Sequence, residues 1–280
     1  MPPSIPTFST VPPSTSFSKL SFPAPHVLLV TLSRPKDLNC INSAGNAELV
    51  QVWQWLDDEP SLRIGIVTGE GRAFCAGADL KEWNTSISFA SPKRSPMPAS
   101  GFGGLSRRIG KKPVIAAVNG IAMGGGCEMI INCDIVLASA VAKFALPEVK
   151  RGLIALAGAL PRLVRTVGKQ RAMEMALTGR SLNAHEARNW GLVNEVVDGD
   201  AETVVERAVE LAKAIAENSP DSVVVSREGV LLGWHGLGAE EGTESLIQGS
   251  WKRMEGGENM KEGVKAFVEK RKPRWVDSKL

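Results

Sequence analysis

Four short apolar runs separated by helical patterns restrict the fold of this chain more than any other feature. They cover residues 27–32, 64–68, 114–118 and 135–138. Each has the length of a buried β-strand. Between them, apolar residues at 49, 50, 53 and 56 predict an amphipathic helix over 44–56, and a second helix is expected from about 124 to 132. Strands that alternate with helices predict an α/β fold with largely parallel pairing.

The two ends of the chain differ from this middle part. Residues 1–25 are dominated by Pro, Ser and Thr, with Lys19 as the only charge, so we expect a disordered N-terminal segment. After about residue 200 the strands stop, and apolar spacing predicts helices over 202–216, 220–232, 239–254 and 258–272. The expected division is an α/β core over 26–200 and a helical C-terminal region over 201–277.

Composition excludes several classes of protein. The net charge of the 280 residues is only +3, too small for a typical nucleic-acid binder, and no apolar run is long enough to span a membrane. The four cysteines form no C-x-x-C pair and lie far from the three histidines, so no metal site is expected. No G-x-G-x-x-G follows a strand, which argues against a dinucleotide oxidoreductase.

The chain stops at Ser278-Lys279-Leu280. This tripeptide is the peroxisomal import address, and it follows a basic segment that a receptor could reach. We therefore expect a peroxisomal protein that binds the import receptor.

Three segments after predicted strands carry the chemistry. In residues 73–82, small residues leave the backbone amide of Ala78 open to a ligand. In 119–128, three glycines, among them Gly125, open a helix whose first turn holds Glu128, and a helix N-terminus suits an oxyanion. In 144–152, Glu148 follows a proline. Each feature alone has a plainer explanation, such as a glycine turn or a surface glutamate; their order and spacing favour a site.

Residues 26–275 resemble the crotonase (enoyl-CoA hydratase/isomerase) family. The matching segments read AFCAGADLKE, KKPVIAAVNGIAMGGGCE, LPEVKRG, AMEMALTG and AFVEKRK. The resemblance implies a spiral of ββα units with a helical C-terminal trimerisation region. It also implies an acyl-CoA thioester substrate, with coenzyme A as part of the substrate and no separate cofactor, and a homotrimer or a hexamer of stacked trimers.

The same resemblance assigns roles to single residues. Ala78 and Gly125 match the two amides of the family's oxyanion hole. Glu128 and Glu148 match the glutamates that hold the catalytic water. We expect the first as base and the second as acid in hydration, with the roles reversed for dehydration; the alternative is that the two roles are exchanged outright. Two carboxyl groups can share this work when one is charged and the other neutral.

The resemblance further implies contacts with the substrate. Lys81 and Lys270 match positions near the coenzyme A phosphates, the second from a neighbouring subunit, although both also fit ordinary surface lysines. The remaining coenzyme A contacts fall in the same segment as Lys81, at Ala76, Asp79 and Leu80. Trp83 and the loop over 84–104 are expected to line the acyl pocket. Leu156 stands where many hydratases carry glycine, which favours a specialised acyl group.

The most direct reading is therefore a hydratase or dehydratase of a peroxisomal acyl-CoA. The chain is similar to fungal peroxisomal members that serve secondary pathways, namely mevalonyl-CoA dehydration for siderophores or acyl-chain tailoring for toxins. General β-oxidation remains open. The alternatives are an enoyl-CoA isomerase of the same fold, which often keeps only one of the two glutamates, and a non-catalytic scaffold that binds acyl-CoA or RNA.

Overall fold

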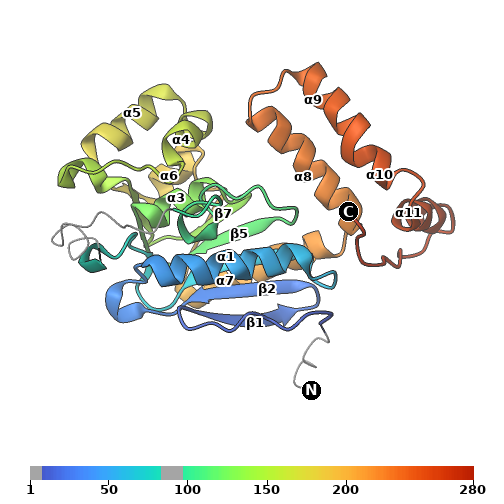
Figure 1. Cartoon of the computed structure of the whole chain (residues 1–280), viewed down its shortest axis with the longest axis horizontal. Helices are drawn as coiled ribbons and strands as arrows, with labels where there is room; N and C mark the ends of the chain where they lie inside the picture. The colour runs from blue at the N-terminus through green and yellow to red at the C-terminus, as the bar shows by residue number, and fades with distance from the viewer. Residues whose placement is uncertain (1–7, 83–96) are drawn as a thin grey trace.

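The computed structural model of this protein describes residues 8–82 and 97–280 (Figure 1). The strands in these residues form two sheets. The six-stranded sheet has the order β1-β2-β3-β5-β7-β10. Its strands are β1 (Ser18–Ala24), β2 (Val27–Leu32), β3 (Ile64–Gly69), β5 (Val114–Val118), β7 (Ile135–Ser139) and β10 (Glu195–Val197). All neighbours pair in parallel except β1, which runs antiparallel to β2 at the edge.

A smaller sheet lies where the large strands end. It consists of β4 (Ala73–Cys75), β6 (Ile121–Met123), β8 (Lys143–Ala145) and β9 (Leu182–Asn183), in that order. Because β3 leads into β4, β5 into β6 and β7 into β8, the chain winds through both sheets as a spiral of ββα units. Strands β2, β3, β5 and β7 occur where the apolar runs predicted them. The short strands were not predicted, because two or three residues show no periodicity.

Helices cover both faces of the large sheet (Figure 1). Helix α1 (Ser43–Asp58) lies on one face and α7 (Ala201–Ala216) on the other. Side chains along β2 alternate accordingly, with Leu28 in the core under α1 and Leu29 in the core under α7. The buried face of α7 is Val204, Ala208, Ala212 and Ala216. These small residues, four apart, let the helix pack closely on the sheet.

The remaining helices form two groups (Figure 1). Helices α3 (Gly125–Ile131), α4 (Ala159–Val167), α5 (Lys169–Thr178) and α6 (Ala184–Trp190) gather at one end of the molecule. Helices α8 (Pro220–Trp234), α9 (Ala239–Leu246), α10 (Lys252–Met254) and α11 (Glu258–Val268) form a separate arm at the other end. The helix predicted over 239–254 is interrupted by a π-helical segment, Ile247–Trp251, in which Gly249 leaves the helical conformation.

The prediction that residues 1–25 are disordered is wrong for the described part, residues 8–25. Strand β1 pairs with β2, and Phe8 packs against Phe22 and Trp55. Two glutamates accept hydrogen bonds from backbone amides of the segment that leads into β1. Buried Glu59 accepts from Ser9 and Thr10, and half-buried Glu48 accepts from Ser16, Phe17 and Ser18. Composition alone could not indicate these partners, because they lie 30 to 50 residues away.

Candidate active site

A cavity of about 920 Å³ lies where the loop after β4, the start of α3 and the segment after β8 meet. The predicted oxyanion-hole residues Ala78 and Gly125 both line it, together with Glu128 and Glu148. Most of the remaining lining is apolar, including Phe102. The fold thus brings together four residues that the sequence spreads over 71 positions, from 78 to 148.

Two residues that line this cavity have backbone amides that the local secondary structure does not use. Ile41 donates to the carbonyl of Gly77, and Asp79 donates to the carbonyl of Ile41, each over 3.0 Å. Because successive amides of an extended chain point in opposite directions, the amide of Ala78 faces away from Ile41. Gly125 is the first residue of α3, so its amide has no acceptor within the helix. Both are therefore donors suited to a thioester oxygen.

The three glycines at the start of α3 each have a steric reason. A Cβ atom added to Gly126 would lie 2.1 Å from the carbonyl oxygen of Cys75, and one on Gly125 would lie 2.7 Å from the ring of Phe102. A Cβ on Gly124, whose φ is +54°, would lie 3.3 Å from Glu148 Oε1. Glycine is thus what allows the helix start to approach both the loop after β4 and the second acid.

Glu128 lies in the first turn of α3 with 4% of its surface exposed. Its Oε2 accepts the amide of Ala159 over 3.1 Å. Burial raises the pKa of Glu128 to about 7; the bond from Ala159 opposes this rise, and the negative charge of Glu148 adds to it. A carboxyl group with this pKa can accept and return a proton near neutral pH.

Glu148 belongs to a short 3₁₀ helix, Pro147–Arg151, that follows β8. Burial raises the pKa of its carboxyl group as well. Its Oε2 is buried and has no hydrogen-bond partner among the described residues. A buried polar atom without a partner is rare in a native protein and indicates a place for a ligand or a water molecule.

The other predicted substrate contacts divide into two groups. Ala76, Leu80 and Leu156 line the cavity. Leu156 is 76% exposed to solvent in the single chain. Asp79 and Lys81 lie outside the lining: Asp79 accepts from Arg34, and Lys81 lies 3.2 Å from Asp37.

Lys270, the contact expected from a neighbouring subunit, lies away from the cavity of its own chain. Lys270 follows α11, in the arm at the far end from α3 (Figure 1). The structure thus leaves its role, like that of Lys81, a prediction. Trp83 and the loop residues 84–96 lie outside the described residues, whereas Met97, Pro98 and Phe102 of the same predicted loop line the cavity.

Sequence reasoning missed the turn at residues 157–159, which supplies the partner of Glu128. The start of α4 follows Gly158, and buried residues Ala159, Leu163 and Val167 recur every four positions along that helix. This spacing, preceded by glycine, was a signal that could have placed the helix start beside the site.

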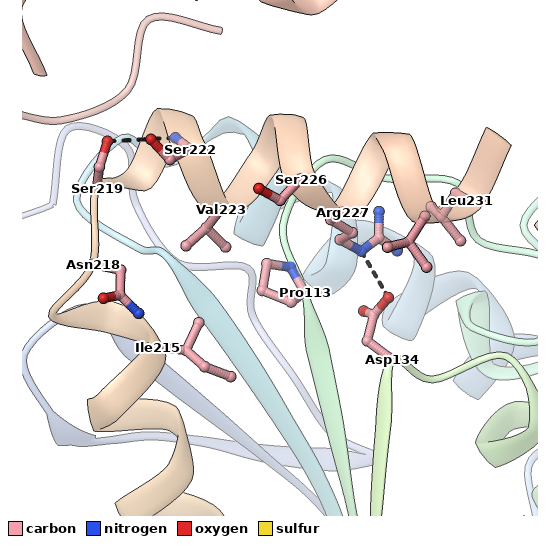
Figure 2. Close-up of a pocket in the computed structure, with 11 residues that line it drawn as sticks. Pro113, Asp134, Ile215, Asn218, Ser219, Ser222, Val223, Ser226, Arg227 and Leu231 are labelled. Carbon is pink, nitrogen blue, oxygen red and sulfur yellow. Dashed lines mark hydrogen bonds and ion pairs between the residues drawn. The ribbon is translucent and has the colours of Figure 1, made fainter. Parts of the chain in front are cut away.

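A second cavity, of about 650 Å³, lies between α8 and the residues that precede β5 and β7, Pro113 and Asp134 (Figure 2). Figure 2 shows Arg227 reaching down from α8 to Asp134, with an N–O distance of 2.8 Å. The other labelled side chains are serines, an asparagine and apolar residues. Because the two charged groups neutralise each other, this cavity shows no acid–base pair comparable to Glu128 and Glu148.

The last three residues lie against the protein surface. Ser278 donates to Asp221, Lys279 pairs with Glu258 over 2.6 Å, and a main-chain oxygen of Leu280 accepts from Lys111. Among the described residues, no helix has the length and hydropathy to cross a bilayer, and no cluster of His, Cys, Asp or Glu side chains is suited to hold a metal ion.

Comparison with known proteins agrees with this geometry. The sequence profile of the enoyl-CoA hydratase/isomerase family matches residues 24–278. The mevalonyl-coenzyme A hydratase SIDH of Beauveria bassiana is 54% identical over 98% of this chain and 100% of its own length. The mevalonyl-coenzyme A hydratase sidH of Aspergillus fumigatus is 54% identical over 93% of this chain and 95% of its own.

Solved structures of enoyl-CoA hydratases have the same fold as this chain. An enoyl-CoA hydratase from Mycobacterium marinum superimposes with a TM-score of 0.84 at 32% identity, over 94% of this chain and 99% of its own. A probable enoyl-CoA hydratase/isomerase from Mycobacterium abscessus does so with a TM-score of 0.84 at 36% identity, over 95% and 100%. The expected fold, the hydro-lyase class and the acyl-CoA thioester substrate are thereby confirmed. The chain belongs to the enoyl-CoA hydratase/isomerase family.

Proposed function

We propose that this enzyme adds water to a 2-enoyl-CoA, and removes it from the 3-hydroxyacyl-CoA, with Glu128 and Glu148 as its acid–base pair. The observation that carries the proposal is the pair of carboxyl groups with raised pKa values in one cavity, that of buried Glu128 and that of half-buried Glu148, beside Ala78 and Gly125. Two carboxyl groups that repel each other's charge favour a state in which one is ionised and the other protonated.

The proposed hydration uses these groups in sequence. Ionised Glu128 takes a proton from water while the water oxygen bonds to the β-carbon. The electron pair of the double bond shifts toward the thioester carbonyl, whose oxygen gains charge and is held by the amides of Ala78 and Gly125. Protonated Glu148 then gives its proton to the α-carbon. Dehydration follows the same path in reverse.

For the acyl group we propose mevalonyl-CoA as the physiological substrate, and dehydration as the direction. The proposal is supported by the two fungal relatives named mevalonyl-coenzyme A hydratase, which are 54% identical to this chain. A mevalonyl group is short, branched at the β-carbon and hydroxylated at its end. Leu156, at the position where many hydratases carry glycine, is consistent with a cavity reshaped for such a group. Of the two secondary pathways considered, this substrate favours siderophore synthesis.

A thioester panel tests the reaction. Purified enzyme should interconvert mevalonyl-CoA and its dehydrated product faster than straight-chain 2-enoyl and 3-enoyl thioesters. Glu128→Gln and Glu148→Gln should each lower turnover by about 10²- to 10⁴-fold, the usual range for a general acid or base.

A matched control is Glu82→Gln. Glu82 lines the same cavity, but its carboxylate accepts the amide of Ser43 at the start of α1. This variant should keep its turnover. The isomerase alternative predicts a different result. The wild-type enzyme would then isomerise a 3-enoyl thioester without hydrating a 2-enoyl thioester, and Glu148→Gln would keep the isomerase activity.

We also propose that the protein assembles as a trimer or as stacked trimers through its C-terminal arm. Large apolar side chains on the arm are exposed in the single chain: Val230, Ile247, Val264, Phe267 and Val268. Exposed apolar groups on one region are typical of an association surface. Light scattering should give three or six copies, and Phe267→Ser should shift the assembly toward the monomer. In the assembled enzyme, Lys270→Ala should raise KM for coenzyme A thioesters.

For the location we propose the peroxisome, on the basis of Ser278-Lys279-Leu280. A fluorescent fusion that keeps this terminus free should colocalise with a peroxisomal marker. Deletion of residues 278–280 should leave turnover unchanged and move the protein to the cytosol. Because Asp221 binds Ser278, Asp221→Ala should make the tail easier for the import receptor to bind.

A further inference from the structure

Two carbonyl groups in the turn at residues 157–159 are held from outside the cavity. Ser106 donates to the carbonyl oxygen of Ala157 over 2.7 Å, and Arg162 Nη1 donates to that of Gly158 over 3.1 Å. The opposite side of this turn faces Glu128, which accepts the amide of Ala159.

Peptide planarity connects these two sides. The carbonyl of Gly158 and the amide of Ala159 belong to one rigid trans peptide group, and they point in opposite directions. Fixing the carbonyl therefore fixes the direction of the amide. The same holds for the carbonyl of Ala157 and the amide of Gly158. The amides of Ala157, Gly158 and Ala159 all favour the ionised form of Glu128.

Ser106 is well placed to hold the first peptide. Its side chain is fully buried, and its hydroxyl oxygen also accepts the amide of Phe102 over 2.8 Å. Phe102 packs against Gly125, the second donor of the oxyanion hole. The Ser106 hydroxyl therefore connects Phe102, which packs against Gly125, to the turn that faces Glu128.

Arg162 holds the second peptide and connects it to the helix that carries Glu128. Its Nε donates to Oδ1 of Asn132 over 2.7 Å, and Asn132 is the C-cap of α3. The Asn132 side-chain amide donates in turn to the carbonyl of Leu105, next to Ser106. A guanidinium on a carbonyl also polarises the peptide and strengthens its amide as a donor.

We propose that Ser106 and Arg162 are positioning residues of the reaction, which act on Glu128 through the peptide groups 157–158 and 158–159. The inference rests on the proposed role of Glu128. The ionisable group that faces Glu128 across the cavity is Glu148, whose charge raises its pKa, and the oriented amides oppose this rise. Loss of their orientation should therefore make Glu128 harder to ionise.

Ser106→Ala is the first test, because it removes the hydroxyl without adding volume. We expect the acid limb of the kcat/KM profile to move up by about half to one pH unit. We expect kcat at pH 7 to fall about tenfold, with KM nearly unchanged, as for a misplaced catalytic group. Arg162→Met should act in the same direction, and Arg162→Lys should restore part of the loss.

Matched controls separate positioning from stability. Ser139→Ala removes another fully buried serine hydroxyl, in β7. Arg165→Met removes an arginine of the same helix that donates to Trp234 instead of to the turn. Both controls should keep the wild-type pH profile. In a Glu128→Gln background, Ser106→Ala should cause no further loss of the residual rate, since its effect passes through Glu128.

An infrared titration of the Glu128 carboxyl group, assigned with Glu128→Gln, gives a readout that does not need turnover. If Ser106→Ala folds and has the same titration midpoint and kcat as Ser139→Ala, the inference is overturned. If Ser106→Ala does not fold, Arg162→Met is compared with Arg165→Met in the same way, and equal midpoints and kcat values would again overturn the inference. Full activity of Glu128→Gln would instead refute the proposed function, and the titration would still report on Ser106 and Arg162.

Discussion

Glu128→Gln should lower turnover by about 10²- to 10⁴-fold and stabilise the protein at the same time, and the gain in stability should depend on pH. The folded protein raises the pKa of Glu128 to about 7, whereas the ordinary value is 4.5. The unfolded chain therefore ionises this group more easily than the folded protein does. The resulting penalty is absent below about pH 4.5 and complete above about pH 7. At 1.36 kcal/mol for each tenfold difference in acid constant, the full penalty is about 3 kcal/mol.

The substitution removes this penalty, because an amide oxygen can still accept the Ala159 amide and carries no charge to desolvate. We expect Glu128→Gln to raise the free energy of unfolding by about 3 kcal/mol at pH 8 and by less than about 1 kcal/mol at pH 5. Urea unfolding at both pH values, at one protein concentration, measures the difference.

Glu59→Gln is the matched control of opposite sign. Although burial opposes it, hydrogen bonds from Ser61, Ser9 and Thr10 lower the pKa of Glu59 to about 2. The stability that Glu59 contributes is present above about pH 4.5 and lost only as the pH falls toward 2. Its replacement should thus cost the same at pH 5 and pH 8. An equal effect of Glu128→Gln at the two pH values would show that the folded protein does not penalise the Glu128 charge.

Three further outcomes are expected. Asp57→Asn should destabilise the protein by about 3 kcal/mol in thermal unfolding, because it leaves the buried guanidinium of Arg108 without its charged partner. Gly126→Ala should lower the melting temperature and cost roughly 1–3 kcal/mol, since its Cβ would meet the carbonyl of Cys75 at 2.1 Å; unchanged stability would mean that the helix start can move. The hydration rate should fall about tenfold for each pH unit below about 7, as Glu128 becomes protonated.

Features encoded within about ten neighbouring residues could be predicted from the sequence. The strands at 27–32 and 114–118 occur with the predicted bounds, and the helix predicted over 202–216 differs from α7 by one residue. The three glycines before Glu128 predicted a helix start near a ligand, since only glycine permits so close a backbone approach there. Periodicity and local sterics depend only on neighbouring residues, so they can be recognised in the sequence without knowledge of the fold.

Tertiary structure alone decided how these local pieces act on one another. The amide that binds Glu128 lies 31 residues further along, and the hydroxyl of Ser106 reaches the same turn across 51 residues. The N-terminal residues 8–17 are ordered by glutamates of α1 and its C-cap that no local pattern connects to them. Burial, and with it the raised pKa of Glu128 and of Glu148, depends on which segments exclude water from a group. Sequence spacing cannot specify this, because desolvation and charge repulsion act through space and not along the chain.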